Sequence, residues 1–277
     1  MKQNKHPKLT ALAIIFMVLL AISGTTVISN IAPTIEPQYE TPISDTATNE
    51  NDNGIEQDDN RNASATHTAT GSYEPTEYDA ELYPDMYRID GKAIIPQNDL
   101  QPGDIEYTYD KSTKTQYVHA LLSYENYEYG KRDRESISGI DPIGWPDKNG
   151  ETSVTFSDGT TYNGWFWNRS HLLGHALGGA DEEKNLVTGT RAQNVGKNDM
   201  NGGMQFAEET ARDYLANHKD GTLYYFVTPI YLDGENIPRS VFVDMRSDDD
   251  SIDMHIEVFN AMPGYEINYI NGTWSKI

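Results

Sequence analysis

A long polar segment limits which part of this chain can fold. Residues 29–76 are rich in Thr, Asn, Asp, Ser, Glu and Pro and contain few large apolar residues. Such a segment cannot bury enough apolar surface to offset the conformational entropy that folding removes. We therefore predict a disordered acidic linker over residues 29–76. The remaining 77–277 segment has the length of one medium-sized folded domain.

The segment ahead of this linker has the pattern of an export signal. Lys2, Lys5 and Lys8 form a positive region, residues 10–22 form an apolar run, and small residues follow at 23–26. The apolar run is short for a spanning helix, which needs about 20 residues. We predict that residues 1–28 are a signal peptide or an uncleaved signal-anchor. The folded part would then be extracellular or at the cell surface, with the membrane contacted only through an uncleaved N-terminal segment.

Composition excludes several kinds of site and weakens one function class. The chain has no cysteine, which rules out a disulfide scaffold, a thiolate zinc site and a cysteine nucleophile. Its formal net charge is −22, and both the N-terminal segment and the folded part are acidic. An acidic balance argues against a protein that binds nucleic acid tightly over a wide surface. A catalytic site, however, needs only a local positive patch and a metal ion, and its substrate binding would be sensitive to salt.

Hydrophobic patterning predicts an α+β fold with a mainly antiparallel sheet. Residues 152–156 and 161–167 flank the sequence Ser-Asp-Gly-Thr and form a predicted β-hairpin. Residues 203–217 have helical periodicity. The apolar face of that helix would consist of Met204, Ala207, Ala211, Tyr214 and Leu215. Further strands are predicted at 117–124, 223–232, 240–245, 253–260 and 265–270.

The segment after the hairpin concentrates side chains suited to phosphate chemistry. Residues 168–196 read NRSHLLGHALGGADEEKNLVTGTRAQNVG, with two histidines, two arginines and several asparagines beside glycines. Hydrolysis of a phosphodiester requires a base that activates water, a cation that offsets developing charge, and donors that hold the phosphate. This segment contains side chains of each type.

Four sequence blocks, in order, resemble one family. They are Arg134-Glu135-Ser136-Ile137 with Pro142 and Gly144-Trp145; Asn168 to Gly174; Asn185 to Arg191 with Asn194-Val195; and Gly203-Met204 with Glu208. Together they resemble the ββα-metal (His-Me finger) DNA/RNA non-specific endonucleases, most of all the Gram-positive branch of DNA-entry and extracellular nucleases. One block alone would be weak evidence, but four in order are strong.

The resemblance implies a catalytic and metal-binding set. His171 would be the general base that deprotonates the attacking water. Asn194 would be the direct protein ligand of one hydrated Mg²⁺, with Mn²⁺ as a possible substitute. Glu208 would hold the water molecules around that metal ion.

It also implies the residues that hold the substrate. Arg134 and Arg169 would bind the phosphate or stabilise its charge, and Arg191 and Asn168 would contact the substrate. The partner would be DNA and RNA, recognised through the sugar-phosphate backbone with little sequence preference. No protein partner is evident. A histidine base also implies activity that rises with pH through its titration range.

The chain departs from the family pattern in two places. Many members have Asp-Arg-Gly-His, where this chain has Asn168 and Ser170. Residues 196–202 also lengthen the segment after Asn194, so that Asn198 or Asp199 could join the metal shell, or the insertion could be a surface loop that contacts substrate.

Other interpretations remain open from the sequence. His171 and His175 would share a helical face and could serve a different metallohydrolase, although Leu172 stands where a zinc peptidase has Glu. A catalytically decayed surface binding module is the second alternative. Asp181 is close enough in sequence to be tested for metal contact. Trp165 and Trp167 are interpreted first as packing residues and only second as base-stacking groups.

Overall fold

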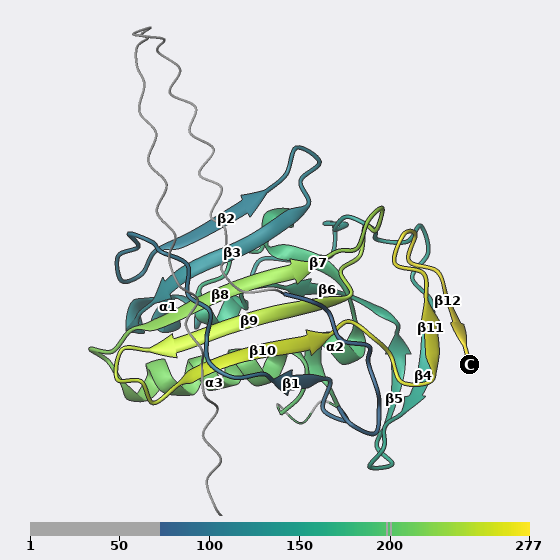
Figure 1. The fold of residues 1–277 in the computed structure, drawn as a ribbon. Helices are drawn as coiled ribbons and strands as arrows, with labels where there is room; N and C mark the ends of the chain where they lie inside the picture. Colours follow the sequence, from purple (N-terminus) through teal and green to yellow (C-terminus); the bar gives the residue numbers. More distant parts are fainter. Residues whose placement is uncertain (1–72, 198, 200) are drawn as a thin grey trace, which may run out of the picture. The chain divides into compact units, whose positions relative to one another are not determined.

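The computed structural model describes residues 73–197, 199 and 201–277 (Figure 1). The predicted N-terminal signal and nearly all of the predicted linker lie outside the described residues. The first described residue, Tyr73, already packs on the domain, since its hydroxyl donates to Asp244 at 2.9 Å. Within the described part of the chain, none of the helices combines the length and apolar character needed to cross a membrane.

A six-stranded sheet forms the centre of the domain. Its strands lie in the order β1-β10-β9-β8-β3-β2, and every neighbouring pair is antiparallel. The strands are β1 (Tyr87–Ile89), β2 (Ile105–Tyr109), β3 (Thr115–Leu122), β8 (Leu223–Ile230), β9 (Ser240–Ser247) and β10 (Asp253–Phe259). The strands predicted from 117, 223, 240 and 253 are thereby confirmed, with ends that shift by a few residues.

The end of β3 shows why one predicted strand is too long. Ser123 begins helix α1 (Tyr124–Tyr129), and its hydroxyl accepts from the amide of Glu125 at 3.3 Å. The Asn126 side chain accepts in return from the Ser123 amide at 2.8 Å. This reciprocal cap satisfies amides that have no partner inside the helix, so the chain turns at Ser123 instead of extending the strand.

Helix α3 (Met204–Asn217) covers one face of the sheet. All five residues of its predicted apolar face are buried, which confirms the predicted pattern. They pack in one cluster with sheet residues such as Leu122, Tyr225 and Val243. The helix starts one residue later than predicted, because Gly203 has a φ of 59° and precedes the first helical residue. A side chain at Gly203 would also collide with the Gln193 carbonyl, since its Cβ would lie 2.2 Å from that oxygen.

The opposite face of the sheet is covered by an N-terminal strap, defined here as the residues of 73–100 that flank β1. Asp244 on β9 is fully buried and accepts from the Tyr73 hydroxyl and from the Ile94 amide at 2.7 Å. Leu100 packs with Tyr224 and Phe226 in a separate apolar cluster on this face. Both faces of the sheet are therefore covered, and a functional surface has to be formed by the segments outside the sheet.

Two small hairpins pack together at the side of the sheet (Figure 1). They are β4 (Glu151–Thr155) with β5 (Thr161–Trp165), and β11 (Tyr265–Ile267) with β12 (Trp274–Lys276). The predicted Asp-Gly turn is confirmed, with Gly159 at a φ of 86° and the Asp158 carboxylate accepting from the Thr160 amide at 2.9 Å. Phe166 stacks on Trp274 with ring centroids 4.5 Å apart. The predicted strand at 265–270 is shorter than expected and pairs with β12 outside the main sheet.

The predicted strand 161–167 is divided at Phe166. Phe166 is fully buried in the second apolar cluster of the domain, so the chain bends there to place its ring. A new strand begins at Trp167 and takes a different partner. That strand leads into the candidate site.

Candidate active site

Two strands and a short helix carry the central motif. Strand β6 (Trp167–His171) pairs antiparallel with β7 (Leu186–Thr190), which places His171 opposite Leu186. Helix α2 (Arg191–Val195) follows β7 directly, and the Thr190 side chain caps it by accepting from the Gln193 amide at 2.9 Å. The order is therefore strand, strand, helix, with His171 at the end of the first strand and Asn194 in the helix.

His171 and His175 do not share a helical face, so that expectation is wrong. Strand β6 ends at His171, and the 3₁₀ turn η1 (His175–Leu177) starts only four residues later. The two rings meet instead through one carboxylate. Asp181 Oδ1 lies 2.9 Å from His171 Nε2, and Asp181 Oδ2 lies 3.1 Å from His175 Nδ1.

His171 is held in a buried, charged environment. Its Nδ1 lies 3.4 Å from a terminal guanidinium nitrogen of Arg134. Burial and the Arg134 charge lower the pKa of His171 from its usual 6.5 to about 4, against the opposing effect of Asp181. The imidazole is therefore neutral at physiological pH, which is the form that a general base requires.

Asn194 is tied to the strand that carries the histidine. The Ser170 hydroxyl donates to Asn194 Oδ1 at 3.1 Å. Ser170 belongs to the first of the two departures from the family pattern, and it is fully buried. Ser170 precedes His171 directly in the sequence, so its hydroxyl holds the Asn194 side chain close to the histidine. A glycine at this position has no side chain with which to make this contact.

Glu208 reaches the same region from α3. A Cβ added at Gly174 would lie 2.6 to 2.8 Å from the Glu208 carboxyl atoms, so the carboxyl packs directly on the Gly174 backbone. Burial and the neighbouring Glu209 raise the pKa of Glu208 to about 8, while Arg134 and Arg212 act in the opposite direction. Any side chain at the last glycine of the block 168–174 would therefore displace this carboxyl.

The arginines occupy different environments. The Arg169 guanidinium donates to the Ile140 carbonyl, lies 2.7 Å from Asp141 and sits 4.1 Å from the centre of the Trp145 ring. Arg134 is about half exposed and contacts both His171 and Asp181. Arg191 lies elsewhere, with its guanidinium 4.9 Å from the centre of the Tyr162 ring on the β4–β5 hairpin.

An open groove of about 820 Å³ runs beside this cluster. Its lining includes four of the predicted site residues, namely Arg134, Asn168, Arg169 and Asn194. Trp165 also lines it and is 53% exposed, so the packing interpretation is wrong for this tryptophan. It is confirmed for Trp167, which is buried and donates from its indole nitrogen to the Gly272 carbonyl at 2.9 Å. His171, Glu208 and Arg191 do not line the groove.

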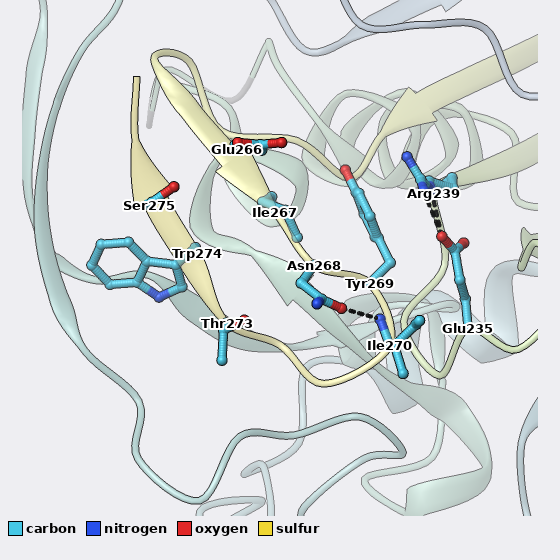
Figure 2. A pocket seen from close by; sticks show the side chains of 10 residues that line it. All are labelled: Glu235, Arg239, Glu266, Ile267, Asn268, Tyr269, Ile270, Thr273, Trp274 and Ser275. Carbon is cyan, nitrogen blue, oxygen red and sulfur yellow. Dashed lines mark hydrogen bonds and ion pairs between the residues drawn. The ribbon is translucent and has the colours of Figure 1, made fainter.

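A second pocket, of about 500 Å³, lies beside β11 and β12 (Figure 2). Figure 2 shows Arg239 paired with Glu235, and the Arg239 Nε lies 2.8 Å from the Glu235 carboxylate. The guanidinium also sits 4.2 Å from the centre of the Tyr269 ring. None of the predicted site residues lines this pocket, and its arginine is already paired with a carboxylate.

The insertion after α2 closes on itself. Gly196 and Gly202 lie back to back, and the Gly203 amide donates to the Asp85 carbonyl at 2.9 Å. Lys197 pairs with Asp85 at 2.8 Å and with Asp158 at 3.2 Å. The Asp199 carboxylate accepts from the Asn201 amide at 3.1 Å, whereas Asn198 lies outside the described residues. These contacts anchor both ends of the loop and let α3 start directly beside α2.

Asp181 is the residue whose role the sequence did not reveal. It was a candidate for metal contact, but it pairs with both histidines and with Arg134. Among the described residues, no group of three or more His, Asp or Glu side chains could hold a metal ion. Only its position ten residues after His171 pointed to this region, and nothing in the sequence indicated which atoms it would contact.

The order β6-β7-α2, with a buried histidine ending the first strand, defines the class of ββα-metal nuclease folds. Comparison with known proteins gives the same result. The model of the DNA/RNA non-specific endonuclease family matches residues 92–269, well over half of the chain. The chain belongs to this family, and the predicted α+β fold is confirmed.

Individual relatives agree with this assignment. A deoxyribonuclease of Streptococcus dysgalactiae subsp. equisimilis is 37% identical over 119 residues, which is 43% of this chain and 36% of the relative. The match thus spans about a third of that relative's length. The structure of the Sda1 nuclease with bound zinc ion has a TM-score of 0.66 and 26% identity, covering 73% of this chain and 100% of that chain.

A further solved structure shows the same fold at lower identity. NucA from Streptococcus agalactiae with magnesium ion bound has a TM-score of 0.54 and 17% identity, and covers 69% of this chain and 92% of that chain. The streptococcal deoxyribonuclease agrees with the Gram-positive branch that the sequence blocks resemble.

Proposed function

We propose that this protein is an exported endonuclease that hydrolyses DNA and RNA with little sequence preference, using His171 as general base and one divalent metal ion. The observation that carries the proposal is the placement of a buried, neutral histidine at the end of β6, one residue from the serine that holds Asn194. Family membership and the streptococcal deoxyribonuclease support the substrate class.

The donor groups fit a hard divalent cation. Asn194 lines the groove and offers a neutral carboxamide oxygen, which Ser170 holds in place. Glu208 is a carboxyl with a raised pKa, so a nearby cation would favour its ionised form. Oxygen donors of this kind suit Mg²⁺, with Mn²⁺ as a substitute. The structures of the Sda1 nuclease with bound zinc ion and of NucA with magnesium ion bound also support a divalent metal.

The described residues divide the remaining chemistry. His171 Nδ1 takes the proton of the attacking water, whose oxygen bonds to phosphorus as the bond to the leaving oxygen breaks. Arg134 lies both in the groove and against His171, so it can bind the phosphate at the point of attack. Arg169, fixed by Asp141 and Trp145, gives the groove a second cation. A bound metal ion would add charge stabilisation on the phosphate and the leaving oxygen.

The groove explains how an acidic protein could hold an anionic substrate. Three cationic side chains, Arg134, Lys148 and Arg169, line it against two carboxylates, Glu135 and Asp147, so the lining has a slight positive excess within the negatively charged surface. Contacts through the phosphates carry no sequence information, so low specificity is expected. Binding should weaken as salt rises. Export is supported by the positive and apolar pattern of residues 1–28.

The two alternatives are less well supported. A zinc hydrolase would need His171 and His175 as joint ligands, but both rings are occupied by Asp181. A decayed binding module would be expected to have lost part of the set, yet His171, Asn194 and Glu208 are all present.

The test uses the full-length chain with circular plasmid or RNA, with and without Mg²⁺, beside His171→Ala and Asn194→Ala. Wild type should nick plasmid only with metal, and His171→Ala should lose roughly 10²- to 10⁴-fold in kcat at any metal concentration. Asn194→Ala should lose activity that excess Mg²⁺ partly restores. Equal activity in wild type and His171→Ala would contradict the assignment of the base. Inactive wild type with every divalent metal tried would contradict the nuclease function.

A further inference from the structure

One buried carboxylate contacts both histidines and the segment that carries Arg134. Asp181 is only 6% exposed at its side chain. Its Oδ1 lies 2.9 Å from His171 Nε2 and 3.3 Å from Arg134 Nε. Its Oδ2 lies 3.1 Å from His175 Nδ1 and accepts from the Glu135 amide at 3.0 Å. Arg134 Nε and the Glu135 amide can only donate to it, and the two histidine rings lie within ion-pair distance, so both carboxylate oxygens are contacted by protein groups.

This arrangement determines which nitrogen of His171 carries the hydrogen. Nε2 faces the carboxylate, and only an N–H at that position gives an attractive contact with it. Nδ1 faces the Arg134 guanidinium, which can only donate, so Nδ1 must supply a lone pair. The hydrogen-bond network therefore assigns the Nε2–H tautomer, with Nδ1 as the basic atom.

We propose that Asp181 is a positioning residue, which fixes the Nε2–H tautomer of His171 and turns Nδ1 toward the substrate. This inference rests on the proposed nuclease function, because it assigns Nδ1 as the atom that takes the proton from water. Asp181 touches neither substrate nor metal ion in this scheme and acts through the imidazole.

The same carboxylate positions Arg134. It binds the Arg134 side chain and the amide of Glu135, and so ties residues 134–138, which line the groove, to the buried histidine. In the substrate-free protein, Arg134 lies over Nδ1. A phosphate in the groove competes for this half-exposed guanidinium and opens Nδ1 to the attacking water. Asp181 thus fixes the position of the base, His171, relative to the phosphate-binding Arg134.

The experiment compares Asp181→Asn with Glu182→Gln in the full-length chain. Both changes replace a carboxylate by its amide, but Glu182 is exposed, and within the described part of the chain its one ion pair is with Lys184 at 3.0 Å. Asp181→Asn should lower kcat on plasmid DNA by roughly 10- to 100-fold, a part of what a positioned general base contributes. KM should change less than threefold, because Asn keeps the size and one acceptor oxygen. Glu182→Gln should match wild type in both.

A spectroscopic readout tests the tautomer independently of activity. With ¹⁵N-labelled histidine rings, the His171 signals are assigned by their loss in His171→Ala. Wild type should show a protonated Nε2 and an unprotonated Nδ1 at pH 7, and Asp181→Asn should show a mixture, since the amide can also donate to Nε2. A merely structural role would leave this signature unchanged in the folded variant.

The outcomes separate this inference from the function on which it rests. If wild type cleaves and Asp181→Asn matches Glu182→Gln in kcat, the positioning role is wrong and the nuclease function stands. If wild type is inactive but its His171 is Nε2–H and changes in Asp181→Asn, the tautomer assignment stands and the nuclease function is wrong. An Nδ1–H signal in wild type would overturn the inference whatever the activity.

Discussion

Two buried histidine–aspartate pairs occupy opposite sides of this domain, and they differ in the groups that surround them. His171 lies 2.9 Å from Asp181 beside the groove, and His255 lies 2.7 Å from Asp244 beneath the strap. All four side chains are almost fully buried. A search for His–Asp pairs alone would therefore rank the two as equal.

Their surroundings separate a candidate site from a structural contact. Asp244 also accepts from the Tyr73 hydroxyl and the Ile94 amide, and the His255 ring stacks on Phe242 at 4.9 Å. These partners join the strap to the sheet. Asp181 instead accepts from Arg134, which reaches a groove that Asn194 also lines. Nδ1 of His171 therefore faces the Arg134 guanidinium, which a bound substrate can displace. This access to the groove distinguishes a catalytic histidine from a structural one better than burial or the His–Asp distance does.

The largest effect is expected on stability, when the structural pair of His255 and Asp244 is broken. Asp244→Ala removes the acceptor of three donors on β10 and the strap, so the free energy of unfolding should fall by about 3–5 kcal/mol. Denaturant unfolding measures this change, and Asp233→Ala, at an exposed loop position, is the matched control. The activity of the molecules that remain folded should equal that of wild type.

The opposite result for Asp244→Ala would contradict the distinction between the structural pair and the candidate site. If Asp244→Ala kept its stability and lost activity, the strap side would take part in function. If Asp233→Ala were equally destabilised, the effect would come from net charge and not from the lost acceptor.

A smaller effect concerns the pH at which the base becomes neutral. Since the pKa of His171 is lowered to about 4, its neutral form is populated above that pH, and the acid limb of kcat/KM should lie near pH 4 instead of 6.5. The Arg134 charge lowers this pKa, so Arg134→Gln should move the limb upward, toward 6.5. Arg132→Gln, at an exposed neighbouring arginine, should leave it in place.

The same shift has a consequence for folding. The unfolded chain takes up a proton on this histidine near pH 6.5 and the folded chain only near pH 4, so stability is lost as the pH falls through that window. Plasmid nicking rates and unfolding curves over that range measure both effects. An acid limb near 6.5 in wild type would show that His171 is far more hydrated in solution than its buried position implies.

Local patterns in the sequence predicted much of the fold and part of the site. Helix α3 and the central strands follow from apolar periodicity, and the Asp-Gly turn of the first small hairpin follows from its own residues. The bend at Phe166 did not follow, because an alternating run shows no sign of a change of partner strand. Burial of the ring against Trp274, more than a hundred residues later, decides it.

The site shows the same division between local and long-range information. The motif blocks indicated His171 and Asn194, but not the Ser170 hydroxyl that connects their elements. Asp181 meets Arg134 only because β6 ends at His171 and the following loop folds back. Contacts between residues 134 and 181 depend on the completed tertiary structure, and a single sequence contains no periodic signal for them.

The smallest predicted effect tests whether the groove side binds substrate. Trp165 and Tyr109 are both 53% exposed, but only Trp165 lines the groove. Stacking of a nucleobase on an aromatic ring contributes about 1–3 kcal/mol, and the lower value suits a ring at the end of an exposed hairpin strand. Trp165→Ala should therefore raise KM for single-stranded DNA roughly fivefold with kcat nearly unchanged, and Tyr109→Ala should have no effect. Equal KM values for the two variants would mean that nucleic acid does not contact this part of the groove. The distinction between the His171–Asp181 side and the His255–Asp244 side would then depend only on the charged cluster around Asp181.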